Sequence, residues 1–494
     1  STPFNIGYGY NGADQLTTIT YPSGRIVQQN YDVMGRLGSI MSGGTTYLSV
    51  PANGYNSAQL PMALNYGSGV AGTFQYNDHL QMSSLNYALG ASTLLNLSYN
   101  YLDANGHNNG QIQSITDSRG DAYSTLFTYD PLGRLIQGQT RNLTAANTWN
   151  LLWNYDIYCN RESQSAGTPA GTLTTGAPQL NIDPATNRIS PSSGFTYDLA
   201  GNVVHDPSHS YTYNAEGELT GVDGTMSYAY DGHRWRMEKT ASGATTIYIY
   251  SGSKVLAEYP AGAAPNAPSK EYVYSGGSLP ATLAGTSVTY HYPDHLSNRF
   301  ETNSAGTVAR TFGHLPFGET WYETGAADKW KFTGYERDSS ESGLDYAMNR
   351  MYSNGYGRFQ TADLLAGSSG NPQSLNRFAY TGNDPLNFID PSGLQQHPIA
   401  YVPPDPDLRF SEFDFLQILF NQINGTTGSS TGSYDPGQNR PCTAAEAFGS
   451  DACVASTPPQ VPTEVIGNFL STISAFSAER MGSNNMTAQT PVHG

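Results

Sequence analysis

One stretch, residues 127–136, reads FTYDPLGRLI, and residues 31–37 read YDVMGRL with the same spacing. Looser copies of this tyrosine-led unit begin at Tyr197, Tyr213 and Tyr230, which are 16 and 17 residues apart, and degenerate copies begin near residues 10, 76 and 103. Unrelated turns in an ordinary β-sandwich are the alternative, but the regular spacing argues against them. The pattern predicts a repeat architecture.

Each unit can be read as one β-hairpin. Tyr129 ends an alternating strand, Asp130 opens a turn by hydrogen-bonding the backbone two residues further on, and Gly133 takes the positive φ. A second strand then starts at Leu135. Because a lone hairpin is marginal in water, the copies must lie side by side to bury one face and pair their edges.

The composition agrees with an all-β protein. The 494 residues include 53 glycines and 35 tyrosines, and 13% are charged, against about 25% in ordinary soluble domains. Tyrosine and β-branched residues suit a pleated, half-buried surface. The formal net charge of −17 (23 Lys and Arg against 40 Asp and Glu) speaks against a nucleic-acid-binding shell.

The cysteines and the apolar runs set further limits. Cys159, Cys442 and Cys453 are too few for a disulfide framework, although Cys442 and Cys453 could bridge a short loop. No run of about 18 apolar residues occurs, so we expect no membrane span. The chain opens with Ser1 and carries no signal-like region there, so we expect a processed or excised piece of a longer protein.

The tyrosine-led units resemble the YD repeats of Rhs proteins, which also occur in the C component of insecticidal toxin complexes and in teneurins. A second set of motifs resembles the Rhs-associated core. These motifs are YPDHLS (292–297), AGTV (305–308), PFGE (316–319), KFTGYERD (331–338), GLDY (343–346), RMY (350–352), GRF (357–359), NRFAY (376–380), NDP (383–385) and DPSGL (390–394).

The resemblance implies an all-β fold in which antiparallel YD-repeat hairpins spiral into a shell or partial barrel, closed by the Rhs-associated core. We expect a YD-repeat shell over 1–285, the core over 286–394 and a variable tail over 395–494. The tail begins with four prolines between residues 395 and 410, which is typical of a linker. Its apolar stretches at 408–423 and 465–476 predict short helices, so the tail is expected to be partly helical.

The resemblance also implies a self-cleavage site. Family members release the tail after the closing Leu by means of two core aspartates, in the manner of an aspartic protease. These aspartates map to Asp363 and Asp390, the scissile bond maps to Leu394–Gln395, and Arg358 resembles a family arginine near the site. Two close carboxylates cannot both ionise, so one can stay protonated while the other takes a proton from water.

One departure from the family pattern lies at the first aspartate. The family usually has Asp-Pro-x-Gly there, whereas this chain reads DLLAG at 363–367, followed by an insertion-like run at 368–374. The alternative interpretation is that Asp363 and Asp390 only cap turns, as Asp often does before Pro.

Other chemistry is not indicated. His291 and His295 are four residues apart, but Pro293 between them excludes a helical metal-ligand pair. We therefore expect these histidines to pack or to hydrogen-bond. No phosphate-binding loop, dinucleotide fingerprint or zinc spacing occurs, so no metal and no cofactor is expected.

Two functions follow from these patterns. In the first, the chain is the C-terminal part of a secreted or cell-surface Rhs-type polymorphic toxin, whose partners are its own tail and secretion-system or cell-surface components. In the second, it is a structural or adhesive surface protein with a silent core and an inert tail. Exposed Tyr, Asn and Thr would then bind glycans, or sheet edges would pair with further copies of the chain.

Overall fold

The computed structural model describes residues 3–399, except 174–178, 327, 339–341, 366 and 369, together with the backbone of two short strands, β37 (Tyr434–Asp435) and β38 (Arg440–Pro441). The chain divides into two compact units, and the larger one, Ile6–Arg409, holds all the other elements. The helices expected at 408–423 and 465–476, and the pair Cys442 and Cys453, lie outside the described residues. Cys159 is buried and free.

The first part of the larger unit is an antiparallel sheet of fourteen strands, each paired with its neighbours in sequence. Side chains alternate along these strands between a buried and an exposed face, as in residues 26–30. The strands are β1 (Gly7–Tyr10), β2 (Leu16–Thr20), β3 (Ile26–Tyr31), β4 (Leu37–Ser42), β5 (Thr45–Ser49), β6 (Ala63–Tyr66), β7 (Val70–Tyr76), β8 (Met82–Leu89), β9 (Ser92–Asn100), β10 (Ser114–Asp117), β11 (Thr125–Tyr129), β12 (Leu135–Thr140), β13 (Asn150–Tyr155) and β14 (Arg161–Ala166).

The repeated turns have one geometry, which Asp130 illustrates. Its Oδ1 accepts hydrogen bonds from the backbone N–H groups of Leu132 and Arg134, both at 2.9 Å. Gly133 has φ +82°, which an L side chain rarely adopts. Arg134 Nε donates back to Asp130 Oδ2 at 2.7 Å. The aspartate, glycine and arginine of the motif therefore build one closed turn.

Tyrosines link each hairpin to the one before it. Tyr129 Oη donates to the carbonyl of Ile112 at 2.9 Å, and Tyr31 Oη donates to that of Leu16 at 2.8 Å. The hydroxyls of Tyr55, Tyr76, Tyr101, Tyr155 and Tyr230 bond an upstream carbonyl in the same way. The repeated tyrosine is therefore a cross-hairpin link as well as a strand residue.

Two short hairpins and a second large sheet follow. The second sheet has twelve antiparallel strands, again paired in sequence order. The hairpins are β15 (Ile182–Asp183) with β16 (Arg188–Ile189), and β17 (Thr196–Tyr197) with β18 (Val203–His205); the sheet contains β19 (Tyr211–Tyr213), β20 (Leu219–Val222), β21 (Met226–Tyr230), β22 (Arg236–Ala241), β23 (Ala244–Ser251), β24 (Lys254–Pro260), β25 (Lys270–Ser275), β26 (Ser278–Ala284), β27 (Ser287–Pro293), β28 (Asn298–Thr302), β29 (Val308–His314) and β30 (Thr320–Thr324).

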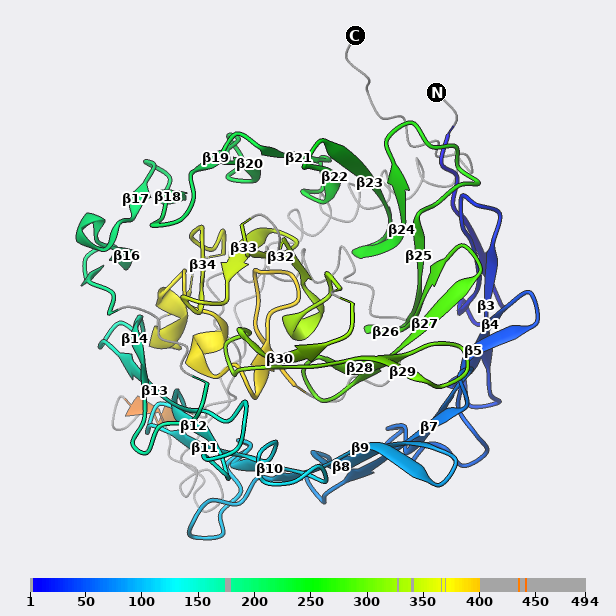
Figure 1. Ribbon diagram of the computed structural model, residues 1–494, viewed down its shortest axis with the longest axis horizontal. Coiled ribbons are helices and arrows are strands. Elements are labelled where there is room, and N and C mark those ends of the chain that lie inside the picture. The colour runs from blue at the N-terminus through cyan, green and yellow to red at the C-terminus, as the bar shows by residue number, and fades with distance from the viewer. Residues whose placement is uncertain are drawn as a thin grey trace. The chain divides into compact units, whose positions relative to one another are not determined.

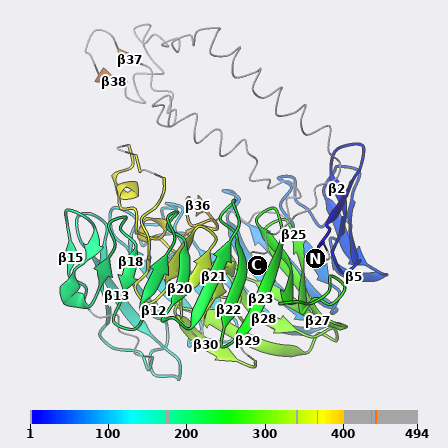
Figure 2. The same ribbon diagram turned by 90° about the horizontal axis from the view of Figure 1, so that it is seen from above.

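The two large sheets form a curved wall whose end turns inward. Figure 1 shows β26–β30 lying inside the arc of β5–β10, and Figure 2 shows strands β20–β23 side by side in the wall. The overlap is a shared hydrophobic core with members from both sheets. Tyr87 Oη, for example, donates to the Pro293 carbonyl at 2.8 Å, and the rings of Tyr66 and Tyr292 lie 4.6 Å apart.

The elements that follow the second large sheet form the core domain, called the core below, which lies within this wall (Figure 1). It contains a four-stranded sheet, a further short hairpin and a buried aromatic cluster around Tyr352 and Tyr380. Its elements are β31 (Glu336–Arg337), β32 (Asp345–Ala347), β33 (Arg350–Ser353), β34 (Arg358–Phe359), β35 (Phe388–Ile389) and β36 (His397–Pro398), with the 3-10 turns η2 (Phe332–Gly334), η3 (Pro372–Leu375) and η4 (Thr381–Asn383); one more such turn, η1 (Pro191–Ser193), precedes β17.

The structure confirms the predicted fold class: antiparallel hairpins spiral around a core, and helix in the described residues is limited to the four short turns. The division of shell from core at residues 285 and 286 stays a prediction. The twelve-stranded sheet runs across this point, since β26 pairs with β27.

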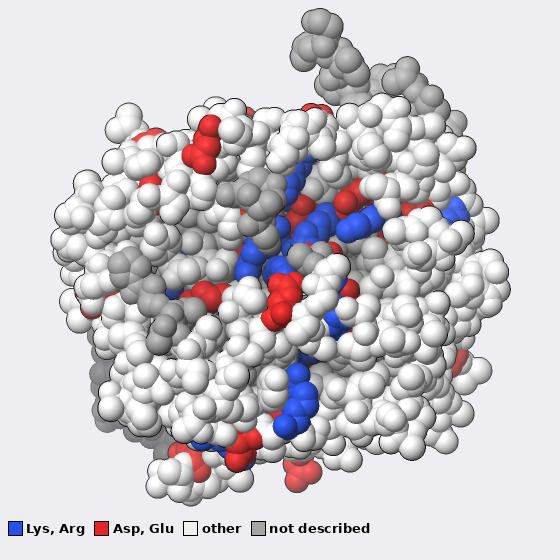
Figure 3. Space-filling view, viewed as in Figure 1, with Lys and Arg blue, Asp and Glu red and all other residues white. Residues whose placement is uncertain are grey.

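Charge is concentrated toward the interior. Figure 3 shows Lys, Arg, Asp and Glu gathered near the centre of the face that is also seen in Figure 1, while the surrounding surface is mostly uncharged. Buried ion pairs join wall to core: Arg236 on β22 lies 2.9 Å from Glu336 and 3.2 Å from Asp338. The sparse charge of the sequence is therefore used partly to fix the core to the wall.

Candidate active site

Asp390 follows β35 and holds the segment after it in a tight turn. Its Oδ1 accepts hydrogen bonds from the backbone N–H groups of Leu394 and Gln395, both at 3.0 Å. The Gly393 N–H donates to the Asp390 carbonyl at 3.2 Å. The predicted scissile bond therefore lies with its amide nitrogen in hydrogen-bond contact with the predicted second aspartate.

Asp363 lies in the loop after β34 and is fixed by its backbone. Its N–H donates to the Arg377 carbonyl at 2.9 Å, and its Oδ1 accepts from the N–H of Leu365 at 2.8 Å. Arg377 in turn donates to the Asp363 carbonyl. Asp363 is held in place despite the departure from the family pattern at 364–367.

Arg350, the first residue of β33, joins the two aspartates. Its Nη2 lies 2.8 Å from Asp363 Oδ2 and 3.3 Å from Asp390 Oδ2. Its Nε donates to the Gly393 carbonyl and its Nη1 to the Arg377 carbonyl. The structure thus brings Asp363, Asp390 and the segment with the predicted scissile bond to one guanidinium.

The environment favours a retained proton on the aspartates. Burial raises the pKa of Asp390 above its ordinary value, and Arg350 offsets this only in part. Burial also raises the pKa of Asp363, with a further contribution from the Asp390 charge. Because the two groups interact through one arginine, their titration belongs to the pair.

Arg358 lies elsewhere. Its Nη2 donates to the carbonyl of Asn187 at 2.5 Å, and its guanidinium lies over the Phe378 ring at 4.9 Å. Within the described part of the chain no ion pair joins Arg358 to either aspartate. The arginine between the carboxylates is therefore Arg350 and not Arg358; a catalytic role for either stays a prediction.

Sequence reasoning missed Arg350 and Tyr335. Tyr335 is buried and donates its hydroxyl hydrogen to the Asp390 carbonyl. Both residues belong to core motifs, but their position at this site depends on how β33 and the loop after β35 meet. The only signal in the sequence was membership of those motifs.

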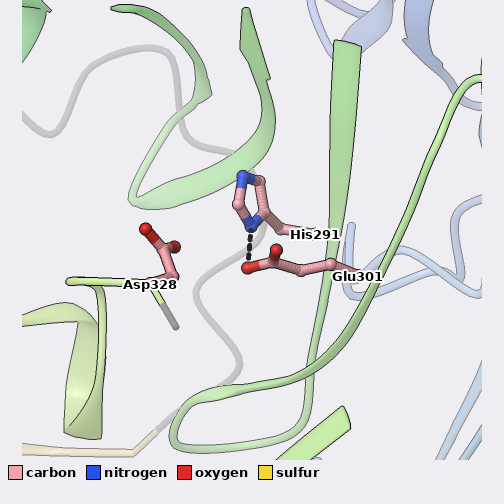
Figure 4. A group of neighbouring side chains, drawn as sticks. All are labelled: His291, Glu301 and Asp328. Carbon is pink, nitrogen blue, oxygen red and sulfur yellow. Dashed lines mark hydrogen bonds and ion pairs between the residues drawn. The ribbon is translucent and has the colours of Figure 1, made fainter. Parts of the chain in front are cut away.

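A second cluster groups three possible metal ligands: His291, Glu301 and Asp328 (Figure 4). His291 Nδ1 bonds Glu301 Oε1 at 3.0 Å, and its Nε2 bonds Thr282 Oγ1 at 2.8 Å. The guanidinium of Arg310 pairs with Glu301 and lies 3.4 Å from Asp328. Since one arginine pairs with both carboxylates, the cluster is an ion-pair network, and His291 is hydrogen-bonded as the sequence predicts.

Residues 53–386 match the family described as Teneurin YD-shell, and residues 10–46 match the RHS repeat. The chain belongs to the teneurin YD-shell family. This agrees with the turns and tyrosine links seen in the wall.

Curated relatives include the tRNA3(Ser)-specific nuclease WapA of Bacillus spizizenii, 30% identical over 254 residues, and the tRNA nuclease WapA of Bacillus subtilis, 29% identical over 254 residues. Each match covers 49% of this chain and 11% of the relative, so the chain spans about a tenth of their length.

Among solved structures, a crystal structure of TcdB2-TccC3 matches with a TM-score of 0.65 and 19% identity, over 79% of this chain and 22% of that one. The Photorhabdus luminescens Tc holotoxin pore gives a TM-score of 0.63 with 19% identity, over 79% of this chain and 21% of that one. The chain is thus an Rhs/YD-shell protein related to WapA, with the fold of a toxin-complex component. Its described residues include no helix long and apolar enough to cross a membrane.

Proposed function

We propose that this chain is the C-terminal part of a secreted or cell-surface Rhs-type polymorphic toxin, in which the β-shell encloses a variable tail that the core frees by cutting after Leu394. One observation carries the proposal: Asp390 Oδ1 lies 3.0 Å from the Gln395 nitrogen while Arg350 joins Asp390 to Asp363. Kinship with WapA nucleases and a fold shared with a toxin-complex component support a toxin role.

The proposed hydrolysis starts with one proton on the carboxyl pair Asp363 and Asp390. Water attacks the Leu394 carbonyl carbon and gives one proton to the Asp363 carboxylate. The bond from that carbon to the Gln395 nitrogen then breaks, and Asp390 gives its proton to the nitrogen. One water is consumed, a carboxyl group and an amine are formed, and the pair again holds one proton.

Arg350 supports both halves of this scheme. A guanidinium shared by two carboxylates fixes their geometry through charge-assisted hydrogen bonds. It also binds the carbonyl of Gly393, the residue just before the one whose carbonyl carbon is attacked. The proposed partners are the chain's own tail and secretion-system or cell-surface components.

The test is intact mass together with denaturing gel electrophoresis of the purified chain. We expect pieces of 394 and 100 residues from the 494-residue chain, and we expect Asp390→Asn and Asp363→Asn each to slow their appearance at least 100-fold, a typical minimum for loss of a general acid or base. Asp32→Asn is the matched control, because Asn supports the same turn and the side-chain hydrogen bonds of Asp32 stay within residues 32–36.

The pH dependence gives an independent check. Because burial raises the pKa of both aspartates, the shared proton is present at low pH and is lost as pH rises, so cleavage slows on the alkaline side. A single uncut band at every pH would overturn the proposal and favour a structural or adhesive surface protein with an inert tail.

A further inference from the structure

The hairpin β32–β33 presents its turn to the segment that contains the predicted scissile bond. Ala347 pairs with Arg350, so the turn consists of Met348 and Asn349. Met348 has φ +57°, in the left-handed region that side chains other than Gly, Asn and Asp seldom adopt. With Met348 in this conformation, Asn349 lies against Ser392.

Asn349 holds the Ser392 carbonyl from two atoms. Its Nδ2 donates to that oxygen at 3.1 Å, and its backbone N–H donates to it at 3.2 Å. The same N–H also donates to Ala347 at 2.7 Å, so it is shared between two acceptors. Of the two hydrogen bonds to the Ser392 carbonyl, the one from the side-chain amide is therefore the one that the turn itself does not require.

Gly393, the next residue, packs directly against the hairpin. A Cβ atom at Gly393 would stand 2.6 Å from the Ala347 carbonyl oxygen, closer than a real Cβ atom comes to such a neighbour. Arg350 Nε donates to the Gly393 carbonyl. Residues 392 and 393 are thus held by contacts with the β32–β33 hairpin, while Asp390 binds the N–H groups of Leu394 and Gln395.

We propose that Asn349 is a positioning residue for the cleavage: by holding the Ser392 carbonyl, its amide sets the Leu394–Gln395 bond at Asp390 and confines cutting to that bond. The inference rests on the proposed function. Asn349 touches neither reacting atom, so it acts through the segment it holds. Displacement of a reacting group by about 1 Å can cost 100-fold in rate.

The experiment follows cleavage of the full chain by intact mass in Asn349→Ala and Asn349→Asp. We expect Asn349→Ala to cut about 10-fold more slowly, with a pH profile of unchanged shape and with some product ends displaced from Leu394. In Asn349→Asp the new carboxylate repels the Ser392 carbonyl, so cleavage is slower still near neutrality. Its protonated form can donate a hydrogen bond, so cleavage recovers on acidification relative to Asn349→Ala.

Asn354→Ala is the control. Asn354 follows β33 and donates to the Gly343 carbonyl at 3.1 Å and to Asp345 Oδ2 at 3.4 Å, contacts that do not involve the scissile segment. We expect it to cut at the wild-type rate and position, and thermal unfolding of all variants separates loss of fold from loss of positioning.

The outcomes are distinct. If the wild type is cut and both Asn349 variants cut at its rate and position, the role of Asn349 is wrong while the proposed function stands. If Asn349→Ala slows cutting only in proportion to its own loss of stability, with the product ends unchanged, the role is also wrong. No cutting of the wild type overturns both.

Discussion

Asp390 caps a turn, and its position there is also compatible with the proposed cleavage, although the sequence presents the two roles as alternatives. The oxygen that caps the turn after β35 is the one that contacts the Gln395 nitrogen. Turn capping and the proposed proton transfer to the leaving amine would therefore use the same carboxyl group. The capping interpretation does not argue against a catalytic one.

Asp384 provides a test of buried charge in the core. It accepts hydrogen bonds from Gln111 on the wall and from Asn387, and burial raises its pKa from 3.8 to about 6. The fold therefore favours the protonated form. Its stabilising contribution is fully present below pH 4 and is lost as pH rises through 6.

We expect Asp384→Asn to raise the free energy of unfolding relative to the wild type above pH 7, by at most about 3 kcal/mol, and the gain to vanish near pH 4. Urea unfolding at pH 4.5 and 7.5 measures it. Asp121→Asn, at an exposed aspartate, should show no such change; a gain that is equal at both pH values would contradict the assignment.

Which arginine reaches the aspartates was not predictable from the chain. Arg350 and Arg358 begin two adjacent strands, and both stand in core motifs. Arg350 reaches both aspartates because the loops around Asp363 and Asp390 cross the start of β33. The two aspartates and the bond after Leu394 came from family motifs, whereas the arginine and Tyr335 required the fold.

The hairpin turn was largely predictable, because its aspartate and glycine are local signals. Two details were not. Tyr155 and Asp156 begin another such turn, in which Cys159 takes φ +64° at the usual glycine position. In the unit at Asp231 the left-handed residue is Arg234 and not Gly232, because the turn geometry fixes it three residues after the aspartate.

The tyrosine link between hairpins can be tested by removing one oxygen atom. Tyr155→Phe deletes the hydrogen bond to the Leu135 carbonyl but keeps the ring under Arg134, 4.9 Å from its guanidinium. We expect a loss of about 1 kcal/mol in the free energy of unfolding.

Tyr123→Phe is the control for this change. Its ring also lies under an arginine, Arg119, at 4.1 Å, and no described residue accepts from its hydroxyl. We expect a change of no more than a few tenths of a kcal/mol by urea unfolding. Equal losses in the two variants would show that the hydroxyl link does not stabilise the wall.

Wall and core together depend on buried charge. Burial alone would raise the pKa of Glu336, but Lys329, Arg236 and Lys239 hold it below its ordinary value. Arg236 is fully buried, and its guanidinium also lies over the rings of three tyrosines. Removing the guanidinium would leave Glu336 and Asp338 buried with only Lys239 and Lys329 to offset their charge.

We therefore expect Arg236→Met to lower the free energy of unfolding by about 3–5 kcal/mol, the usual cost of breaking a buried ion pair from one side. Chemical unfolding measures the loss. Arg188→Met is the control, since Arg188 lies over the Tyr197 ring and pairs with no carboxylate among the described residues; its cost should stay near 1 kcal/mol. A small loss at Arg236 would mean that packing alone joins wall and core.

The order of strand pairing also bears on how such a protein is made. Since every strand of the two large sheets bonds only to the strands just before and after it, the sheet hydrogen bonds of each ribbon form with nearby chain, whereas the hydrophobic core shared with β26–β30 is completed later. Contacts of short sequence separation form quickly, so the wall can grow ribbon by ribbon during translation. The number of repeats then sets the circumference, and the core arrives last.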